Sequence, residues 1–135
     1  MKILICGSRN YDNAALIYGF VRSLPDNAII VEGEAKGADS LSREAAILYG
    51  LEVEKYPANW NLYGPQSGYL RNIQMLKEGK PDYIIAYSND IKNSKGTKHM
   101  INQGIKNNVP TYLNVNKWED IKNNLIKPIT KLNNL

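Results

Sequence analysis

A loop at residues 33–39, with the sequence Gly-Glu-Ala-Lys-Gly-Ala-Asp, is the first place in this chain where residue types and spacing suggest chemistry. It follows a β-branched apolar run at 28–32, and apolar residues at helical spacing come after it. Its glycines let backbone N–H groups approach an anion closely, and Asp39 or Ser40 is placed to cap the next helix. The pattern predicts a phosphate cradle, although such turns also join strands to helices for structural reasons alone. The candidate ligand-binding residues of the loop are Gly33, Glu34, Ala35, Lys36, Gly37 and Asp39.

Three further loops carry polar or aromatic residues suited to a nucleotide. Ser8 and Arg9 offer a hydroxyl and a planar guanidinium beside a helix start, a combination that suits phosphate. Arg71 could hold phosphate or ribose, or could instead pair with a carboxylate of the 33–39 loop. An aromatic ring in the loop at 57–67 could stack on a base, or could anchor its own loop. The candidates in these loops are Gly7, Ser8, Arg9, Trp60, Tyr63, Arg71, Asn72, Gly96 and Thr97.

The apolar patterning predicts the elements that must position these loops. Strands are predicted at 2–6, 28–32, 51–56, 83–87 and 109–115. Helices are predicted at 14–24, from about 40 to Gly50, at 70–76, 96–105 and, from capping-box spacing at 116–119, up to about 127. The alternation indicates one mainly parallel five-stranded sheet covered on both faces, an α/β/α domain at 1–127 with a tail at 128–135 expected to fray. Ligands of such sheets bind beyond the carboxyl ends of the strands, so the four loops are expected to share one crevice.

Composition excludes several classes of site. Cys6 is the only cysteine and His99 the only histidine, so no zinc cluster can be assembled, and we expect neither a metal nor a cofactor. The apolar runs are too short to span a bilayer, which predicts a soluble cytoplasmic protein without membrane contact. Residues 1–91 hold nine basic and eleven acidic residues, a net charge of −2, and residues 92–135 hold eight and two, a net charge of +6. The lysines of that last third are mixed with asparagines, which favours a solvated surface over a nucleic-acid groove.

Taken together, the motifs resemble those of the SLOG superfamily, and most closely its small single-domain branch related to YspA and YpsA. The resemblance runs from residue 2 to about 115 and rests on Gly-Ser-Arg at 7–9, Gly-x-Ala-x-Gly-Ala-Asp at 33–39, Pro-Ala-Asn-Trp at 57–60, Gly-x-x-Arg-Asn at 68–72 and Gly-Thr at 96–97. The superfamily includes LOG phosphoribohydrolases, the DNA-processing protein DprA and sensor domains for nucleotide signals in bacterial defence. The resemblance implies a Rossmann-like fold and a nucleotide-type ligand.

Two positions depart from the LOG pattern. LOG enzymes have a catalytic glutamate where this chain has Met100, and a thioether cannot serve as an acid or base. His99 could substitute as a base, but a lone helical histidine is more often structural. Glu34 stands where the branch commonly has glycine, and beside a phosphate its carboxylate must point away or bind ribose hydroxyls.

These observations leave three hypotheses. The first is a sensor or sequestering protein that binds an NAD-derived or ADP-ribose-type signal. A protein this small, with no output domain, could act by sequestering the signal, as phage proteins that blunt nucleotide-based immunity do. In it Arg9, Lys36 and Arg71 bind phosphates, Glu34 binds ribose, and Trp60 or Tyr63 binds the base. The second is an N-glycosidase or phosphoribohydrolase that uses Glu34 or Asp39. The third is a DprA-like module for single-stranded DNA, which nothing in residues 1–91 favours. We also expect a homodimer, with helix faces bearing Tyr69, Met75 or Met100 as its contact.

Overall fold

A computed structural model describes residues 1–134 of the chain. Its centre is a five-stranded, fully parallel sheet in the order β3-β2-β1-β4-β5. The strands are β1 (Lys2–Gly7), β2 (Ile29–Glu32), β3 (Glu52–Lys55), β4 (Tyr83–Tyr87) and β5 (Thr111–Leu113). The predicted parallel α/β sheet is therefore confirmed.

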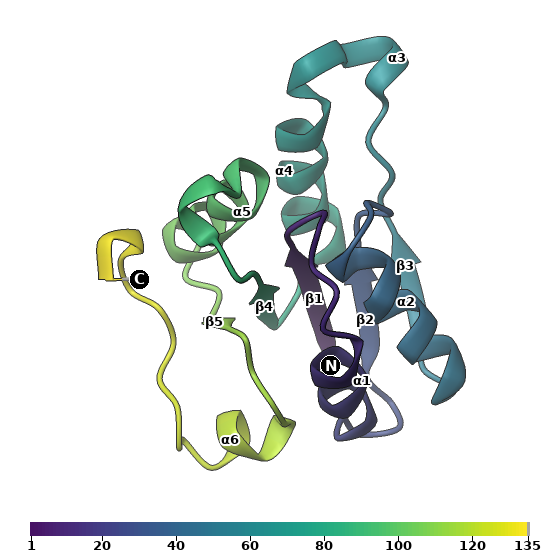
Figure 1. Cartoon of the computed structure of the whole chain (residues 1–135), viewed down its shortest axis with the longest axis vertical. Coiled ribbons are helices and arrows are strands. Elements are labelled where there is room, and N and C mark those ends of the chain that lie inside the picture. The colour runs from purple at the N-terminus through teal and green to yellow at the C-terminus, as the bar shows by residue number, and fades with distance from the viewer. Residues whose placement is uncertain (135) are drawn as a thin grey trace.

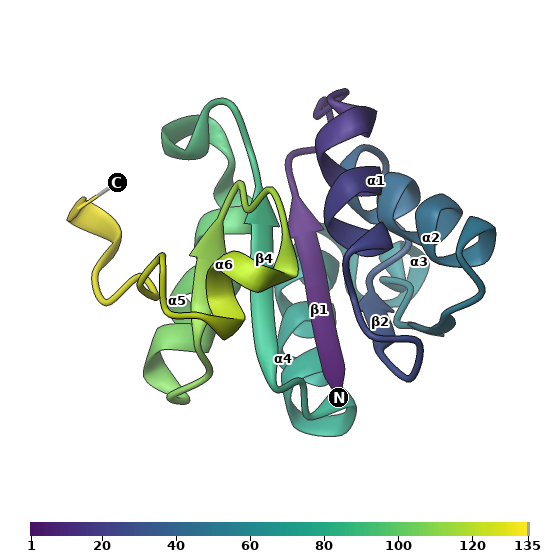
Figure 2. The same cartoon turned by 90° about the horizontal axis from the view of Figure 1, so that it is seen from below.

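Helices cover both faces of the sheet, which makes the three layers of a Rossmann-like domain (Figures 1 and 2). The main helices are α1 (Ala14–Arg22), α2 (Ala38–Leu48), α4 (Ser67–Gly79), α5 (Lys95–Lys106) and α6 (Trp118–Lys122). One core cluster joins α1, α2 and α6 to the sheet through residues such as Phe20, Ala45 and Ile121. The other joins α4 and α5 to the opposite face through Met75, Met100 and Ile101.

The strand order creates a switch point between β1 and β4. After β1 the chain continues into α1, on the same face as α2, whereas after β4 it continues into α5 on the other face. The loops that follow these two neighbouring strands therefore diverge, and a crevice opens beyond their carboxyl ends. Gly7, at the end of β1, has no room for a side chain, because a Cβ there would overlap the carbonyl oxygen of Tyr87.

Several predicted boundaries are wrong. The loop at 57–67 contains a short helix, α3 (Trp60–Tyr63), and a 3-10 turn, η1 (Gly64–Gln66), which no periodicity indicated. The last helix ends at Lys122, because Asn124 takes a left-handed conformation with φ of 57°. Its predicted capping box does not form, since the N-cap is Lys117 and the Trp118 amide donates instead to Ser23 Oγ, at 2.8 Å.

The tail is packed against the body of the domain. The Ile129 amide donates to the Thr111 carbonyl at the free edge of β5, at 2.7 Å, and the Ile129 and Leu132 side chains lie against the α4–α5 core. Figure 1 shows this yellow segment, which ends in the 3-10 turn η3 (Leu132–Asn134), beside α5. The expected fraying is therefore wrong up to Leu132, and Leu135 lies outside the described residues.

The helices of residues 1–134 include none with the length and apolar character that a membrane span requires.

Candidate functional site

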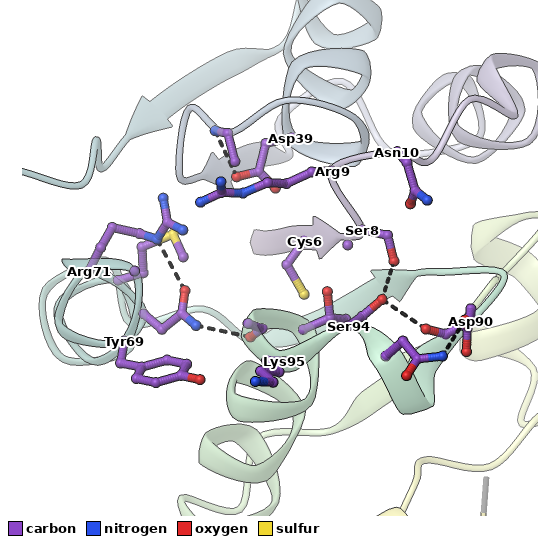
Figure 3. Close-up of a pocket in the computed structure, with 18 of the residues that line it drawn as sticks. Cys6, Ser8, Arg9, Asn10, Asp39, Tyr69, Arg71, Asp90, Ser94 and Lys95 are labelled. Carbon is purple, nitrogen blue, oxygen red and sulfur yellow. Dashed lines mark hydrogen bonds between the residues drawn. The ribbon is translucent and has the colours of Figure 1, made fainter. Parts of the chain in front are cut away.

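A cavity of about 470 Å³ opens at the switch point, beyond the carboxyl ends of β1 and β4 (Figure 3). This volume lies within the range of small-molecule sites. Ten of the residues predicted from the sequence line it: Gly7, Ser8, Arg9, Ala35, Asp39, Trp60, Arg71, Asn72, Gly96 and Thr97. Five predicted residues do not line it: Gly33, Glu34, Lys36, Gly37 and Tyr63.

The 33–39 loop uses its own amide groups internally. Asp39 Oδ2 accepts hydrogen bonds from the amides of Gly33, at 3.1 Å, and Ala35, at 3.2 Å. The Glu34 amide donates to Glu32 Oε1 at 2.8 Å. Two buried carboxylates thus occupy the position of the anion that the sequence pattern predicts for this loop. The helix that follows begins at Ala38 with Gly37 as its N-cap and no side-chain cap, so the predicted cap by Asp39 or Ser40 is wrong.

Two charged residues of this loop, Glu34 and Lys36, do not line the cavity. Lys36 is exposed, and Glu34 forms an ion pair with Lys55 of β3, with 3.7 Å between Nζ and Oε1. Of the two orientations predicted for Glu34, the structure has the one that points away. Gly37 packs on the loop after β1, where a Cβ would overlap the Ser8 carbonyl, so it joins the two loops without facing the ligand space.

Arg71 links α4 to the 33–39 loop. Its Nη1 donates to the Gly33 carbonyl, and its Nε donates to Asn72 Oδ1 at 3.1 Å. Burial raises the pKa of Asp39, and the nearby positive charge of Arg71 opposes that shift. Arg71 therefore holds the loop and supplies positive charge to the cavity wall at the same time.

Arg9 lies across the mouth of the cavity on an aromatic ring. Its guanidinium carbon is 5.2 Å from the ring centroid of Trp60, which comes from α3 and is about half exposed. In Figure 3 the Arg9 side chain extends over Asp39 toward the side of the cavity where Arg71 lies. Trp60 is thus placed by a cation–π contact on the rim, where a base could also stack.

The other side of the cavity is the N-terminus of α5. Its N-cap, Ser94, makes no side-chain bond to the helix; its Oγ bonds Ser8 Oγ at 2.6 Å and the Asp90 carbonyl at 2.9 Å. Ser88 completes this hydroxyl cluster, 2.6 Å from Ser8 Oγ. The amides of the first turn consequently remain without a side-chain cap beside Lys95, an arrangement that favours an anion. Thr97, one of the predicted ligand-binding residues, lies buried inside this first turn and lines the cavity.

Asn72 fixes the floor between α4 and α5. Its Nδ2 donates to the Gly96 carbonyl at 3.2 Å and lies 3.1 Å from His99 Nδ1. The His99 ring packs on Tyr69, with 4.6 Å between centroids, and Tyr69 lines the cavity. Burial lowers the pKa of His99, which keeps the imidazole neutral and favours the structural role for it.

Two further residues bear on chemistry. Met100 is fully buried in the α4–α5 core and does not line the cavity. The Cys6 thiol lies on the cavity wall, and burial raises its pKa, so it stays protonated and is a poor nucleophile. Within residues 1–134, no group of three or more histidine, cysteine or acidic side chains could hold a metal ion.

The sequence interpretation missed half of the cavity wall. The missed residues are Cys6, Asn10, Pro65, Gly68, Tyr69, Met75, Asp90, Asn93, Ser94 and Lys95. Four of them belong to the polar loop and helix start that follow β4. That loop follows a strand just as the others do, so its place at the same edge of the sheet was the available signal.

Fold and site together define a Rossmann-like α/β protein whose crevice at the switch point suits an anionic ligand. Residues 1–63 match the model of the YspA, cpYpsA-related SLOG family, YAcAr. This match over the N-terminal part of the chain supports the resemblance to the SLOG superfamily that the motifs predicted. It is 28% identical over 120 residues to the Gene 61 protein of Mycobacterium phage D29, covering 81% of this chain and 92% of that protein.

Two solved structures share the fold. DNA processing protein A (DprA) from Streptococcus pneumoniae superposes with a TM-score of 0.54 and 17% identity, covering 90% of this chain and 60% of that one. UDP-GlcNAc 2-epimerase from Neisseria meningitidis, bound to UDP-GlcNAc, gives a TM-score of 0.51 and 13% identity, covering 84% and 32%. The chain thus spans less than two thirds of either protein, and these likenesses concern the fold.

Proposed function

We propose that the cavity binds a nucleotide-derived signal molecule of the NAD or ADP-ribose type and that the protein acts as a sensor or sequestering protein. The observation that carries this proposal is the convergence of Arg9, Arg71 and Lys95 with the uncapped start of α5 around one cavity. The rings of Trp60 and Tyr69 also line this cavity. Cations and helix amides suit phosphate, and the rings suit a base.

The structure changes which residues take the roles in this proposal. Lys95 replaces Lys36 as the lysine that faces phosphate, because Lys95 lines the cavity and Lys36 does not. Tyr69 replaces Tyr63 as the second aromatic residue for the same reason. We assign Glu34 no role in ribose binding, because it does not line the cavity and forms an ion pair with Lys55.

A small domain that holds such a ligand without transforming it would lower the ligand's free concentration. The relative from phage D29 is a phage protein, and sequestration of an immune signal would give a phage a direct benefit. We therefore extend the proposal to a phage-type anti-defence role.

Thermal-shift measurement and calorimetry against AMP, NAD, ADP-ribose and cyclic ADP-ribose isomers test the proposal. We expect at least one to stabilise the protein at millimolar concentration. Adenosine and ribose 5-phosphate should each bind more weakly than the whole ligand, because each retains only one half of the contacts. Failure of every nucleotide to stabilise the protein would refute the proposal, and release of free base on chromatography would point instead to the N-glycosidase.

Matched lysine variants locate the site. Lys95→Gln should weaken the binding of the active nucleotide by about threefold to tenfold, because it removes one charge from the cavity wall. Lys92→Gln and Lys36→Gln should leave affinity unchanged, because both lysines are exposed and neither lines the cavity. Equal losses for all three would indicate a diffuse charge effect instead of a site.

A further inference from the structure

Glu32, the last residue of β2, is a charged side chain with no access to solvent and incomplete hydrogen bonding. Its exposed fraction is 0%. Oε1 accepts hydrogen bonds from the Glu34 amide, at 2.8 Å, and from Arg43 Nη1, at 3.1 Å. Oε2 is buried and has no partner among the described residues. A buried carboxylate oxygen without a donor is costly to keep charged, and a bound proton removes that cost.

The charged groups around Glu32 come from each neighbouring element. Arg43 and Asp39 face it from α2, and Glu34 faces it from the loop. Lys55, its register partner on β3, pairs with Glu34, and Arg71 of α4 lies beyond Asp39. Burial raises the pKa of Glu32 to about 7, with the negative charge of Asp39 acting in the same direction and the Glu34 amide and Arg43 opposing it.

Asp39 connects this buried carboxyl to the cavity. It lines the cavity, it accepts the amides of Gly33 and Ala35, and its charge acts on Glu32. An anion that enters the cavity adds negative charge on the same side of Glu32 as Asp39 does. Such a charge favours the protonated form of Glu32 in the same sense as Asp39.

We propose that Glu32 takes up a proton when an anionic ligand enters the cavity, so that occupancy of the site depends on pH. This inference rests on the proposed function, because it needs an anionic ligand in that cavity. By linkage, a ligand that draws a proton onto Glu32 binds more tightly at low pH than at high pH. The 33–39 loop, held between Glu32 and Asp39, is then the element in which pH and ligand act together.

Calorimetry with ADP-ribose tests the coupling, because its pyrophosphate does not titrate near neutral pH and any proton taken up belongs to the protein. Titrations at pH 7 in PIPES and in Tris, whose ionisation enthalpies differ, give the number of protons bound. We expect net uptake of a fraction of a proton by the wild type, and an affinity that falls by about threefold to tenfold between pH 6 and pH 8.

Two variants assign the proton. Glu32→Gln keeps an oxygen to accept the Glu34 amide and Arg43 but cannot titrate, so its proton uptake and its pH dependence should vanish. Glu44→Gln, which removes an exposed carboxylate of α2 that does not act on Glu32, should behave as the wild type. Equal proton uptake by wild type and Glu32→Gln would overturn the proposal, and would assign the proton to another group such as Asp39, whose pKa burial also raises and which lines the cavity, or His99.

Unfolding without ligand separates this inference from the proposed function. Glu32 holds its proton more tightly in the folded than in the unfolded chain, so its contribution to stability is lost as pH rises from about 4.5 to 7. Glu32→Gln should therefore have a higher Tm than the wild type at pH 8 and a smaller difference at pH 5. Identical Tm profiles refute the buried proton itself. If the Tm profiles differ but ADP-ribose binds at no pH, the buried proton on Glu32 is supported. The coupling of that proton to ligand binding, and ADP-ribose as the ligand, are then both rejected.

Discussion

The guanidinium of Arg71 on α4 donates a hydrogen bond to the carbonyl oxygen of Gly33, thirty-eight residues earlier in the chain. This contact joins the loop after β2 to α4, which packs on the face of the sheet opposite to α2, across one wall of the cavity. Glycine at position 33 leaves room for this contact, because a Cβ there would overlap the Arg71 guanidinium.

Gly33→Ala should displace the flexible Arg71 guanidinium from the Gly33 carbonyl and lower the free energy of unfolding by about 0.5–1.5 kcal/mol, the contribution of one hydrogen bond, measured by urea denaturation. Gly19→Ala is the matched control: it lies exposed within α1, its nearest heavy atom would be 4.0 Å from the new Cβ, and it should stabilise the helix by about 0.5–1 kcal/mol. A stable Gly33→Ala protein with unchanged ligand affinity would show that Arg71 can adopt another position without loss.

Asp39→Ala should destabilise the protein by about 2–3 kcal/mol, because it leaves the amides of Gly33 and Ala35 without an acceptor. Asp39→Asn should cost less, since the amide oxygen still accepts from the same groups. Thermal unfolding of the pair separates loss of hydrogen bonds from loss of charge, and equal costs would mean that the charge is what matters.

Trp60 should report ligand binding by its fluorescence, because it lies on the rim of the cavity in contact with Arg9. Trp118, the other tryptophan, packs on Tyr83 and does not line the cavity, with 5.2 Å between ring centroids. Ligand titrations should change the emission of Trp118→Phe as they do that of the wild type, and leave that of Trp60→Phe nearly constant. The opposite pattern would place the ligand elsewhere.

His99 should oppose Glu32 in the pH dependence of stability. Burial lowers the pKa of His99 below its usual 6.5, so the folded chain favours the neutral imidazole. The contribution of His99 to the stability of the fold is therefore present above pH 6.5 and is lost as the pH falls through the lowered pKa. His99→Gln can still interact with Asn72 and should reduce the loss of Tm between pH 6.5 and 5 relative to the wild type. A parallel loss in both proteins would show that His99 does not titrate in this range.

Much of the fold could be predicted from local sequence, because short β-branched runs and helical spacing are local signals. Strand β4 was predicted with its observed bounds, and the other strands to within two residues at each end. Helix ends were harder, since they depend on distant partners: the Trp118 amide is satisfied by Ser23, ninety-five residues earlier, and not by the predicted capping box. The short helix α3 has no periodicity to detect, and its Asn59 cap gives it only one hydrogen-bonded turn.

The sequence by itself determined that four glycine-containing loops follow strands of one parallel sheet, and so that Arg9, Arg71 and Thr97 would lie at one edge of it. Only the tertiary structure decided which side chains face the cavity. Lys36 and Lys95 are both lysines beside a glycine, yet one points to solvent and the other lines the cavity. The reason is physical: a loop satisfies its buried amides with whatever acceptor the fold brings close, and here Glu32 and Asp39 fill the cradle at 33–39 while the start of α5 remains without a side-chain cap.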